Sequence, residues 1–575
     1  MSNMENQEIE QIFRKYIMLC FVAICTCITF MSVVGYGGIV LFPQIKHIII
    51  TIGAGLARKD INTDTWTHRL QGVSLTGFII STLLFIFSFK ALISRISIKK
   101  KDISYNIIIA FLIGFYSLML VILASTSNDL WTDEALTFME IKFSLKDFDW
   151  LNHAFPHPLF YFIFAKCYSL FFGGSIFAMK LFSTIPTILM VIFATLFLKS
   201  EFSYKTALFF LLSCFASESI THFSIEIRMY SWALFFLTMM AISSWFFIKS
   251  EKKYWRVILL LCALGAAYTH YHSLVTAGFM YLLLLFYIIK YRKDKIYSAV
   301  FVAITAIILY SPQLFLLLRS FGRLSSNFWI PKLTLTTVLD SILMVFYTGY
   351  KIFDIVFILL FLTVLTISLI RKNKTEKDFF AFYVLISFLL FLLFMIAFSI
   401  IAAPTLVNRY LVPSYGLIWL FFSIECSAIS NKRITAFFCI ILFTIGLMSF
   451  SFSINKERNK NHQFYTFYNT ITEKLKSDDS FLIISANDEV GKSYHIYNIL
   501  RYYFYDHDIN FINYDGYDPE SSPARTTWIL LNTTWRVGIE PNNIAGDFKG
   551  YFGWNGTHPH WDGTPGDFKL FYYSP

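Results

Sequence analysis

Apolar segments long enough to cross a bilayer recur along the chain as far as residue 454, and they restrict it to a membrane-spanning fold. A transmembrane helix needs ~20 apolar residues. Segments of about this length lie near 16–42, 72–97, 104–125, 176–198, 205–225, 229–248, 255–273, 274–290, 297–318, 352–370, 379–402, 410–429 and 434–454. With 56% hydrophobic and only 15% charged residues, the sequence predicts a polytopic α-helical membrane protein with about 13 transmembrane helices.

Basic residues between these segments predict the orientation. They cluster in every second connection, at Arg14-Lys15, 99–101, Lys199 with Lys205, 249–256, 290–295, 371–377 and Lys432-Arg433. Because cytoplasmic loops are rich in Lys and Arg, these connections and the N-terminus are assigned to the cytoplasm. The connections 43–71, 126–175 and 319–351, and everything after Asn455, are then expected outside. The same loops account for much of the net charge of +11, so no nucleic-acid partner is expected.

The chain divides into an N-terminal pair of transmembrane helices over 1–103 and a transmembrane core over 104–454. The core carries the external loop 126–175. In that loop an apolar stretch of about fourteen residues follows His157-Pro158-Leu159-Phe160-Tyr161. A span there would place every later basic loop outside, so we interpret the stretch as a helix lying on the outer membrane surface.

The tail, 455–575, differs in composition from the rest of the chain, because Gly, Asp, Asn and Pro return and long apolar runs end. Short strand-like runs at 481–485, 509–513 and 528–532 accompany a helical pattern near 494–504. We therefore expect a soluble external domain of the α/β class.

Two adjacent carboxylates, Asp133 and Glu134, stand a few residues beyond the span that ends near Ser125. Neighbouring side chains point in different directions, so one carboxylate can face a reacting centre while the other anchors the loop or a cation. The structural alternative is the first turn of a solvated helix, where acidic residues are favoured. Trp131 and the aromatic stretch that follows the loop predict instead a partly dry pocket.

Further polar residues fall at the same predicted side. Glu218, His222 and Glu226 have the spacing i, i+4, i+8 of one helical face, and Arg228 and Tyr230 follow at the end of that span. Satisfied polar groups at a helix end are the alternative. The functional interpretation is that Glu226 faces the same cavity as Asp133, with Arg228 available for a phosphate.

Two more span ends add imidazole and guanidinium groups. His270 and His272 end one outward span, and Arg409 and Tyr410 begin an inward one. They could be interfacial anchors or, for Arg409, a snorkelling side chain. Four separate segments would nevertheless deliver polar groups to one side. The middle of each span carries almost no ionisable residue, which argues against a transporter with a coupled-ion site at the midplane.

The ordered set of motifs resembles the GT-C membrane glycosyltransferases, of the type that includes protein O-mannosyltransferases and the lipid A aminoarabinose transferase (glycosyltransferase family 39-like). The motifs cover roughly residues 104–430 and are Trp-Thr-Asp-Glu-Ala (131–135), His-Pro-Leu-Phe-Tyr (157–161), Phe-Gly-Gly-Ser (172–175), Glu-Ile-Arg-Met-Tyr-Ser (226–231), Tyr-Thr-His-Tyr (268–271) and Arg-Tyr-Leu (409–411). Two departures are Pro158-Leu159, where the family often has two prolines, and Lys180, where an Arg is common.

The resemblance implies a cavity at the outer membrane face, a polyprenyl-phosphate sugar donor and inversion at the anomeric carbon. It implies Asp133 as the general base, with Glu134 beside it in the catalytic pair. Arg409, Arg228 or His157 would neutralise the leaving phosphate. The remaining expected substrate-binding residues are Glu226, Tyr230, His270, His272 and Tyr410. A divalent cation participates in some relatives, and Asp133, Glu134 and Glu226 could hold one here; the resemblance implies no other cofactor.

The leading hypothesis is thus a multi-pass glycosyltransferase of the bacterial inner membrane, with a cytoplasmic N-terminus and a periplasmic C-terminal domain. Its acceptor would be an envelope lipid, glycan or protein. The first alternative is a lipid-linked glycan flippase or transporter, in which the outer carboxylates control passage of the substrate and do not catalyse. A non-catalytic scaffold that keeps the same fold is the second.

Overall fold

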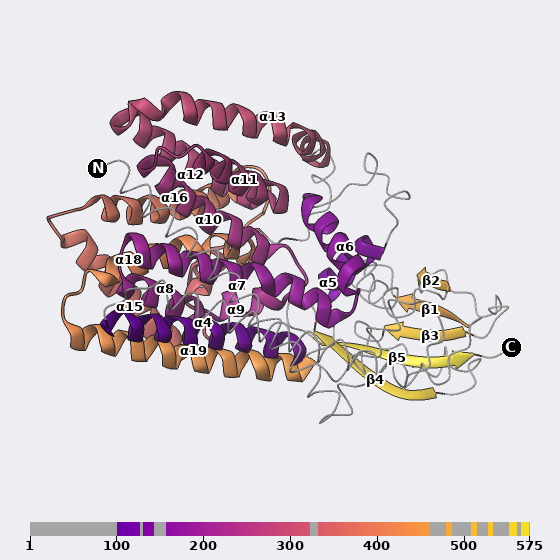
Figure 1. Cartoon of the computed structure of the whole chain (residues 1–575). Helices are drawn as coiled ribbons and strands as arrows, with labels where there is room; N and C mark the ends of the chain where they lie inside the picture. The colour runs from indigo at the N-terminus through magenta and orange to yellow at the C-terminus, as the bar shows by residue number, and fades with distance from the viewer. Residues whose placement is uncertain are drawn as a thin grey trace, which may run out of the picture. The chain divides into compact units, whose positions relative to one another are not determined.

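The structure is a computed structural model that describes residues 100–126, 130–142, 157–321, 330, 332–460, 479–485, 508–513, 527–532, 551–559 and 565–573. The two spans predicted before residue 100 lie outside the described residues. Helices and short 3₁₀ turns make up most of the described residues before 461 (Figure 1).

The first helices are α4 (Lys100–Thr126), α5 (Thr132–Lys142), α6 (Phe160–Phe172), α7 (Ile176–Glu201), α8 (Tyr204–Ala216), α9 (Glu218–Ile225), α10 (Tyr230–Lys249), α11 (Tyr254–Thr269), α12 (Tyr271–Tyr291) and α13 (Ile296–Phe321). After these come α14 (Leu335–Leu343), α15 (Lys351–Ile370), α16 (Glu376–Ile401), α17 (Asn408–Leu411), α18 (Tyr415–Ser427) and α19 (Lys432–Lys460). The 3₁₀ turns are η1 (Lys293–Lys295), η2 (Met344–Phe346) and η3 (Val412–Ser414).

Most spans predicted between residues 104 and 454 correspond to one helix each, but 205–225 is the pair α8 and α9, and 410–429 is divided among α17, η3 and α18. Eight of the described helices are long and apolar enough to cross a membrane, and α8 with α9 would make a ninth as one bent span. α11 and α18 are shorter, with 16 and 13 residues. The count of 13 transmembrane helices therefore stays a prediction, while a membrane bundle of many helices is present.

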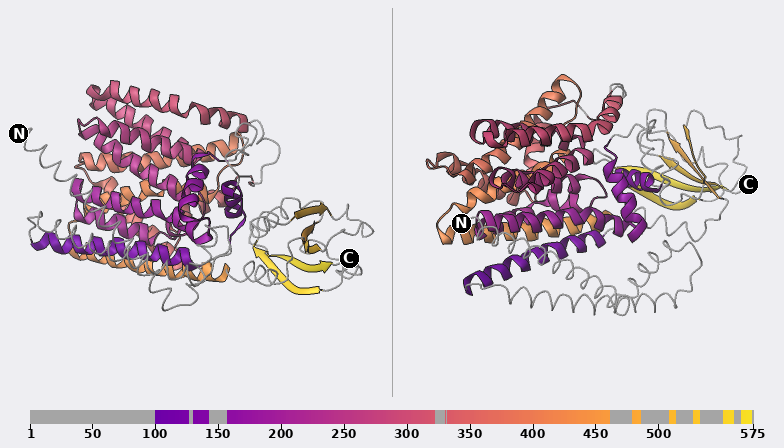
Figure 2. Two further views of the ribbon diagram at one scale, coloured as in Figure 1. Left: turned by 45° about the vertical axis from the view of Figure 1, so that its right-hand side comes forward. Right: turned by 45° about the horizontal axis from the view of Figure 1, so that its top comes forward.

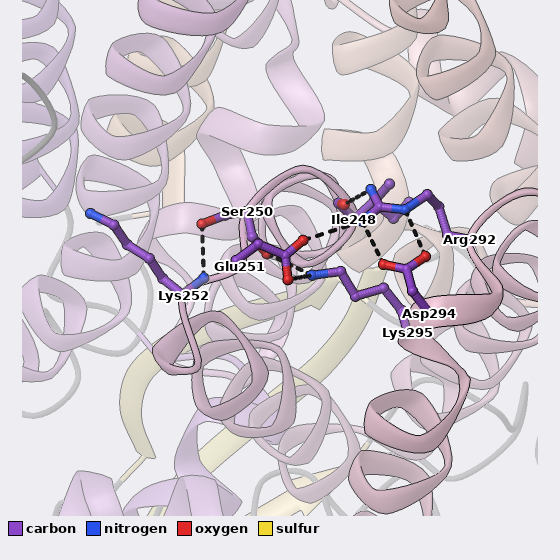
Figure 3. A network of polar contacts seen from close by, with 7 residues as sticks. All are labelled: Ile248, Ser250, Glu251, Lys252, Arg292, Asp294 and Lys295. Carbon is purple, nitrogen blue, oxygen red and sulfur yellow. Dashed lines mark hydrogen bonds and ion pairs between the residues drawn. The ribbon is translucent and has the colours of Figure 1, made fainter. Parts of the chain in front are cut away.

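The long helices run side by side and alternate in direction (Figures 1 and 2). One end of the bundle carries the connections that precede α10, α12 and α18, together with α5 and α6. The other end carries the basic connections. Figure 3 shows two of these held together: Lys295 Nζ lies 2.7 Å from Glu251 and donates to the Ser250 carbonyl, while Arg292 pairs with Asp294 at 2.8 Å.

Two pairs of helices, α18 with α10 and α19 with α8, approach one another at glycines. The residues of α18 from Tyr415 to Cys426 are all buried. A Cβ at Gly416 would lie 2.0 Å from Thr238 Oγ1 on α10, and one at Gly446 of α19 would lie 2.2 Å from the Phe215 ring. Small residues permit such close helix contacts in membranes. α13, in contrast, exposes Phe301, Ile304 and other large apolar side chains, as expected for a helix facing lipid.

The segment 204–226 differs from the predicted continuous helix. Ser217 is both the C-cap of α8 and the N-cap of α9, where its side chain accepts a hydrogen bond from Ile220 N, and the two helices meet at a bend of 67°. α9 ends at Ile225, and Glu226 has extended backbone. The prediction that Glu218, His222 and Glu226 share one helical face is therefore wrong, because the helix ends before Glu226.

Glu218 and His222 face α19 instead. Ser453 Oγ donates to Glu218 Oε1 at 3.3 Å, and His222 Nδ1 lies 4.0 Å from Glu457 Oε1. Lys180 of α7 pairs with the same Glu457 at 3.5 Å, and both side chains are buried. These contacts fix α9 between α7 and α19, so that its C-terminal end is held at the end of the bundle with α5.

The tail contains a five-stranded sheet in the order β2-β1-β3-β5-β4. The strands are β1 (Ser480–Ser485), β2 (Asp508–Asn513), β3 (Thr527–Asn532), β4 (Tyr551–Pro559) and β5 (Pro565–Tyr573). β1 is parallel to β2 and β3, and β5 is antiparallel to β3 and β4.

The first three strands of this sheet match the three runs predicted from sequence. β4 and β5 were not predicted, because β4 has glycines in place of apolar alternation and its register shifts between Tyr551 and Asn555. The helical pattern near 494–504 lies outside the described residues, so the α/β class of this domain stays a prediction.

Candidate active site

Asp133 lies in the first turn of α5 with two arginines beside it. Its Oδ2 is 3.3 Å from Arg409 Nη2 and 3.9 Å from Arg228 Nη2. Asp133 is only 8% exposed, and Arg228 is buried as well. In such surroundings charges interact more strongly than at a protein surface. The three side chains come from α5, the turn before α10, and α17, so the tertiary fold creates the cluster.

Arg228 is held by groups on both sides. Its Nη1 donates to the Asp133 carbonyl at 3.1 Å and to Thr137 Oγ1 at 3.2 Å. Its Nη2 lies 2.7 Å from His157 Nε2, which accepts the hydrogen bond because a guanidinium can only donate. Burial and the charge of Arg228 lower the pKa of His157 well below its ordinary value. His157 is therefore a neutral ring that orients Arg228.

Arg409 enters the cluster from α17, directly before α18. Its guanidinium carbon lies 5.1 Å from the centre of the Trp131 ring, a cation–π distance, and 5.7 Å from that of Tyr410. Burial disfavours its charge, but Tyr230 and Asp133 outweigh that effect, and the pKa of Arg409 is raised. Trp131 and Asp133 thus hold the permanently charged guanidinium of Arg409 next to the Asp133 carboxylate.

Glu134 binds backbone N–H groups with both of its carboxylate oxygens. Its Oε1 accepts a hydrogen bond from Ile227 N at 2.9 Å, and its Oε2 accepts one from Trp131 N at 3.2 Å. The side chain therefore ties the start of α5 to the turn that carries Arg228. Of the two roles open to the acidic pair, this contact pattern favours loop anchoring for Glu134.

Glu226 is the second buried carboxyl near the cluster. It is 5% exposed, and its Oε1 has no hydrogen-bond partner among the described residues. Burial, and next the charge of Glu134, raise its pKa to about 8. Glu226 is therefore mostly protonated at neutral pH.

The acidic residues do not form a cation site as they are arranged here. Asp133 faces two guanidinium groups, and both oxygens of Glu134 accept backbone hydrogen bonds. Over the described ranges, no group of three or more His, Cys, Asp or Glu side chains is close enough together to bind a metal. A divalent cation held by Asp133 and Glu226 stays a prediction that this donor set does not favour.

Aromatic and imidazole rings lie beside the arginines. His270, the residue between α11 and α12, is at the centre of this ring cluster. Its ring centroid is 5.7 Å from His157, 5.0 Å from His272, 5.3 Å from Tyr410 and 5.7 Å from Tyr230. Burial and the neighbouring His272 lower the pKa of His270 well below its ordinary value.

All the residues predicted to form the site thus lie in or beside one cluster at one end of the bundle, although their roles are untested. Thr137 was not predicted. Its hydroxyl donates to the Asp133 carbonyl and receives a hydrogen bond from Arg228. The i, i+4 spacing of Asp133 and Thr137 on a helix was the available signal.

Long apolar helices that alternate between two ends make this chain a multi-pass membrane protein, and it shares its fold with ArnT, a GT-C lipid A aminoarabinose transferase. The chain is similar to ArnT from Cupriavidus metallidurans bound to undecaprenyl phosphate, with a TM-score of 0.57, 10% identity, and coverage of 81% of this chain and 99% of ArnT. It is also similar to ArnT from the same organism in the apo state, with a TM-score of 0.58, 9% identity, and coverage of 82% of this chain and 100% of ArnT. No protein-family model and no curated protein matches the sequence.

Proposed function

We propose that this chain is a membrane glycosyltransferase that moves a hexose or pentose from a polyprenyl-phosphate donor to an envelope lipid, glycan or protein. The reaction would occur at the outer face of the bacterial inner membrane. The observation that carries the proposal is the carboxylate of Asp133 between Arg228 and Arg409, at the bundle end away from the basic loops. The undecaprenyl phosphate bound to an ArnT of the same fold supports a polyprenyl-phosphate donor.

The chemistry requires a base and a group that stabilises the leaving phosphate. Asp133 takes the proton of the acceptor hydroxyl as the hydroxyl oxygen attacks the anomeric carbon. The bond from that carbon to the phosphate oxygen breaks, and the polyprenyl phosphate leaves with the electron pair. Arg409 and Arg228 neutralise its charge, since guanidinium groups bind phosphate through paired hydrogen bonds. Attack from the side opposite the phosphate inverts the anomeric configuration.

Asp133→Asn tests this assignment, because the amide keeps the size of the side chain but cannot accept the proton. Radiolabelled polyprenyl-phosphate sugars would be incubated with the purified protein and envelope fractions from cells that lack it. We expect the transfer rate to fall by a factor of about 100 or more. Asp340→Asn, the same change at an exposed position of α14, is the matched control and should keep the wild-type rate.

Transfer at the normal rate by Asp133→Asn would contradict the role of Asp133 as base. Movement of the labelled lipid across a proteoliposome membrane without transfer would instead favour the flippase. Loss of transfer in both the Asp133 and the Asp340 variants would point to a folding defect, which thermal unfolding of each purified variant detects.

A further inference from the structure

Several buried polar atoms beside the arginines have no hydrogen-bond partner among the described residues. Both ring nitrogens of His270 are without one, although this residue is only 1% exposed. The hydroxyl of Tyr230 and Oε1 of Glu226 are also buried without a hydrogen-bond partner among the described residues. Burying a polar group without a partner is costly, so such groups in one place indicate that something else satisfies them.

These groups are neighbours of the proposed phosphate site. The His270 ring lies 5.7 Å from the Tyr230 ring and 5.7 Å from the His157 ring, and His157 contacts Arg228 directly. A molecule whose phosphate lies on Arg228 and Arg409 would therefore bring its next chemical group to His270. In a polyprenyl-phosphate sugar the phosphate joins the sugar to the isoprenoid chain, and of these two groups only the sugar has hydroxyls that can satisfy His270, Tyr230 and Glu226.

The hydrogen-bonding groups on this side are uncharged at neutral pH. Lowered pKa values keep His157 and His270 neutral, and the raised pKa keeps Glu226 mostly protonated. A neutral imidazole has one donor and one acceptor nitrogen, and a protonated carboxyl offers both as well. A sugar hydroxyl also donates and accepts, so it can satisfy these groups in pairs.

The same surroundings are unfavourable for an ammonium group. The guanidinium groups of Arg228 and Arg409 already place positive charge there. The Asp133 carboxylate pairs with these arginines, and the Glu134 carboxylate accepts hydrogen bonds from backbone N–H groups. Within the described part of the chain, Glu226 is the remaining carboxyl at this cluster, and its ionisation is opposed by burial and by Glu134. A cationic sugar would meet like charge there.

We propose that His270, Tyr230 and Glu226 form the subsite for the donor sugar, and that this sugar is an uncharged one recognised through its hydroxyl groups rather than an amino sugar. The inference rests on the proposed function, because it assumes a polyprenyl-phosphate donor. It separates this chain from the aminoarabinose transferases that share its fold, since their sugar carries an amine.

Binding of defined lipids to the purified full-length protein in detergent tests the inference. The probes are undecaprenyl phosphate alone, its glucosyl and arabinosyl derivatives, and the matching 2-amino-2-deoxyglucosyl and 4-amino-4-deoxyarabinosyl derivatives. We expect one of the neutral sugars to tighten binding about tenfold over undecaprenyl phosphate, as one or two added hydrogen bonds would. Its amino counterpart should bind no better than undecaprenyl phosphate.

His270→Phe keeps a ring but removes both nitrogens, so it should abolish the gain from the neutral sugar. In this variant the Kd of the neutral-sugar lipid should therefore equal that of undecaprenyl phosphate, so that the ratio of the two affinities falls from about ten to about one, whereas Arg409→Ala should weaken the binding of every lipid. His270→Gln, which retains a donor and an acceptor, should recover part of the gain. The comparison of neutral with amino sugars on the wild-type protein needs no variant and so does not depend on variant folding.

The two proposals fail differently. If undecaprenyl phosphate binds but the amino sugar adds as much affinity as the neutral one, or no sugar adds any, the sugar inference is wrong and the donor class stands. If none of the lipids binds the wild-type protein, the proposed function is wrong and the subsite proposal with it.

Discussion

At the residue scale, Asp133 and Glu134 are adjacent in sequence, yet their carboxylates have different partners. Asp133 contacts the guanidinium groups of two side chains, whereas Glu134 accepts hydrogen bonds from two backbone N–H groups. A substrate phosphate can draw the arginines away from Asp133. No substrate can replace the backbone partners of Glu134 without moving α5. The two residues should therefore respond differently to the same acid-to-amide change.

We expect Glu134→Gln to lower the thermal stability by a few degrees and transfer by no more than about tenfold. The amide loses one acceptor, and a hydrogen bond to a charged group contributes about 1.5–3 kcal/mol. Thermal unfolding in detergent and steady-state transfer rates measure the two effects. Glu134 would have to be regarded as catalytic if the amide variant lost as much activity as Asp133→Asn while unfolding at the wild-type temperature.

The buried carboxyl of Glu226 predicts how the stability of the protein depends on pH. Its pKa is raised to about 8 in the folded protein, above that of an unfolded glutamate, so folding favours the protonated form. The unfolded chain then binds fewer protons between the two pKa values, and stability must fall as pH rises from about 5 to 8. We expect the Glu226→Gln variant not to show this loss of stability, because glutamine does not titrate. Its unfolding temperature should match that of the wild type near pH 5 and exceed it near pH 8.

The comparison of the two proteins at each pH is the control, since all other titrating groups are shared. A difference in unfolding temperature that stays constant from pH 5 to 8 would mean that Glu226 keeps an ordinary pKa and is not buried as described. A variant less stable at pH 8 would mean that its charged form makes favourable contacts.

The site residues could be predicted from sequence to the extent that they mark the ends of spans. Arg228, His270 and Arg409 each follow or precede an apolar segment, and charge at such a position is visible without a structure. The contact of Glu134 with Ile227 N could not be predicted, because it depends on how closely α5 approaches the turn before α10. Backbone partners of this kind carry no sequence signature.

At the scale of elements, the position of Arg409 depends on the contact between α18 and α10. Gly416 of α18 lies so close to α10 that a Cβ would come within 2.0 Å of Thr238 Oγ1. Thr238 already donates to the Leu234 carbonyl at 2.8 Å, so it cannot turn away without losing that bond. We expect Gly416→Ala to separate the two helices, lower the unfolding temperature by several degrees and reduce the affinity for undecaprenyl phosphate.

Gly278→Ala on α12 is the matched control, because nothing lies within 4 Å of its Cβ and alanine favours a helix. It should leave the unfolding temperature and the lipid affinity unchanged or slightly raised. Equal behaviour of the two variants would show that the α10–α18 contact is not as close as described.

The bend between α8 and α9 shows where the prediction of elements failed. Ser217 followed by Glu218 is a common start of a helix, but it stands within an apolar run that was interpreted as one span. Hydropathy measures the length of an apolar segment and is insensitive to a change of direction inside it. After the bend α9 ends at Ile225, and the turn that follows carries Glu226 and places Arg228 beside Asp133, so the segment that was predicted least well contributes two residues to the site.

At the scale of the whole molecule, the basic connections and the arginine cluster lie at opposite ends of the helices. Lys253 precedes α11 at the basic end, and His270 follows α11 at the site end. The same alternation holds for α10, α12 and α16. If the positive-inside rule holds for this chain, a donor presented on the outer leaflet reaches the site without crossing the membrane.

Single cysteines in a background whose native cysteines are replaced by alanine test this orientation. Lys332→Cys places a thiol at the exposed connection before α14 at the site end, and Lys253→Cys places one at the exposed connection before α11 at the basic end. A membrane-impermeant maleimide should label Lys332→Cys in intact spheroplasts and Lys253→Cys only after permeabilisation. Labelling in the reverse pattern would put Asp133 and both arginines at the cytoplasmic face. The donor would then have to be used on the leaflet where it is made, and the proposed reaction at the outer face would be excluded.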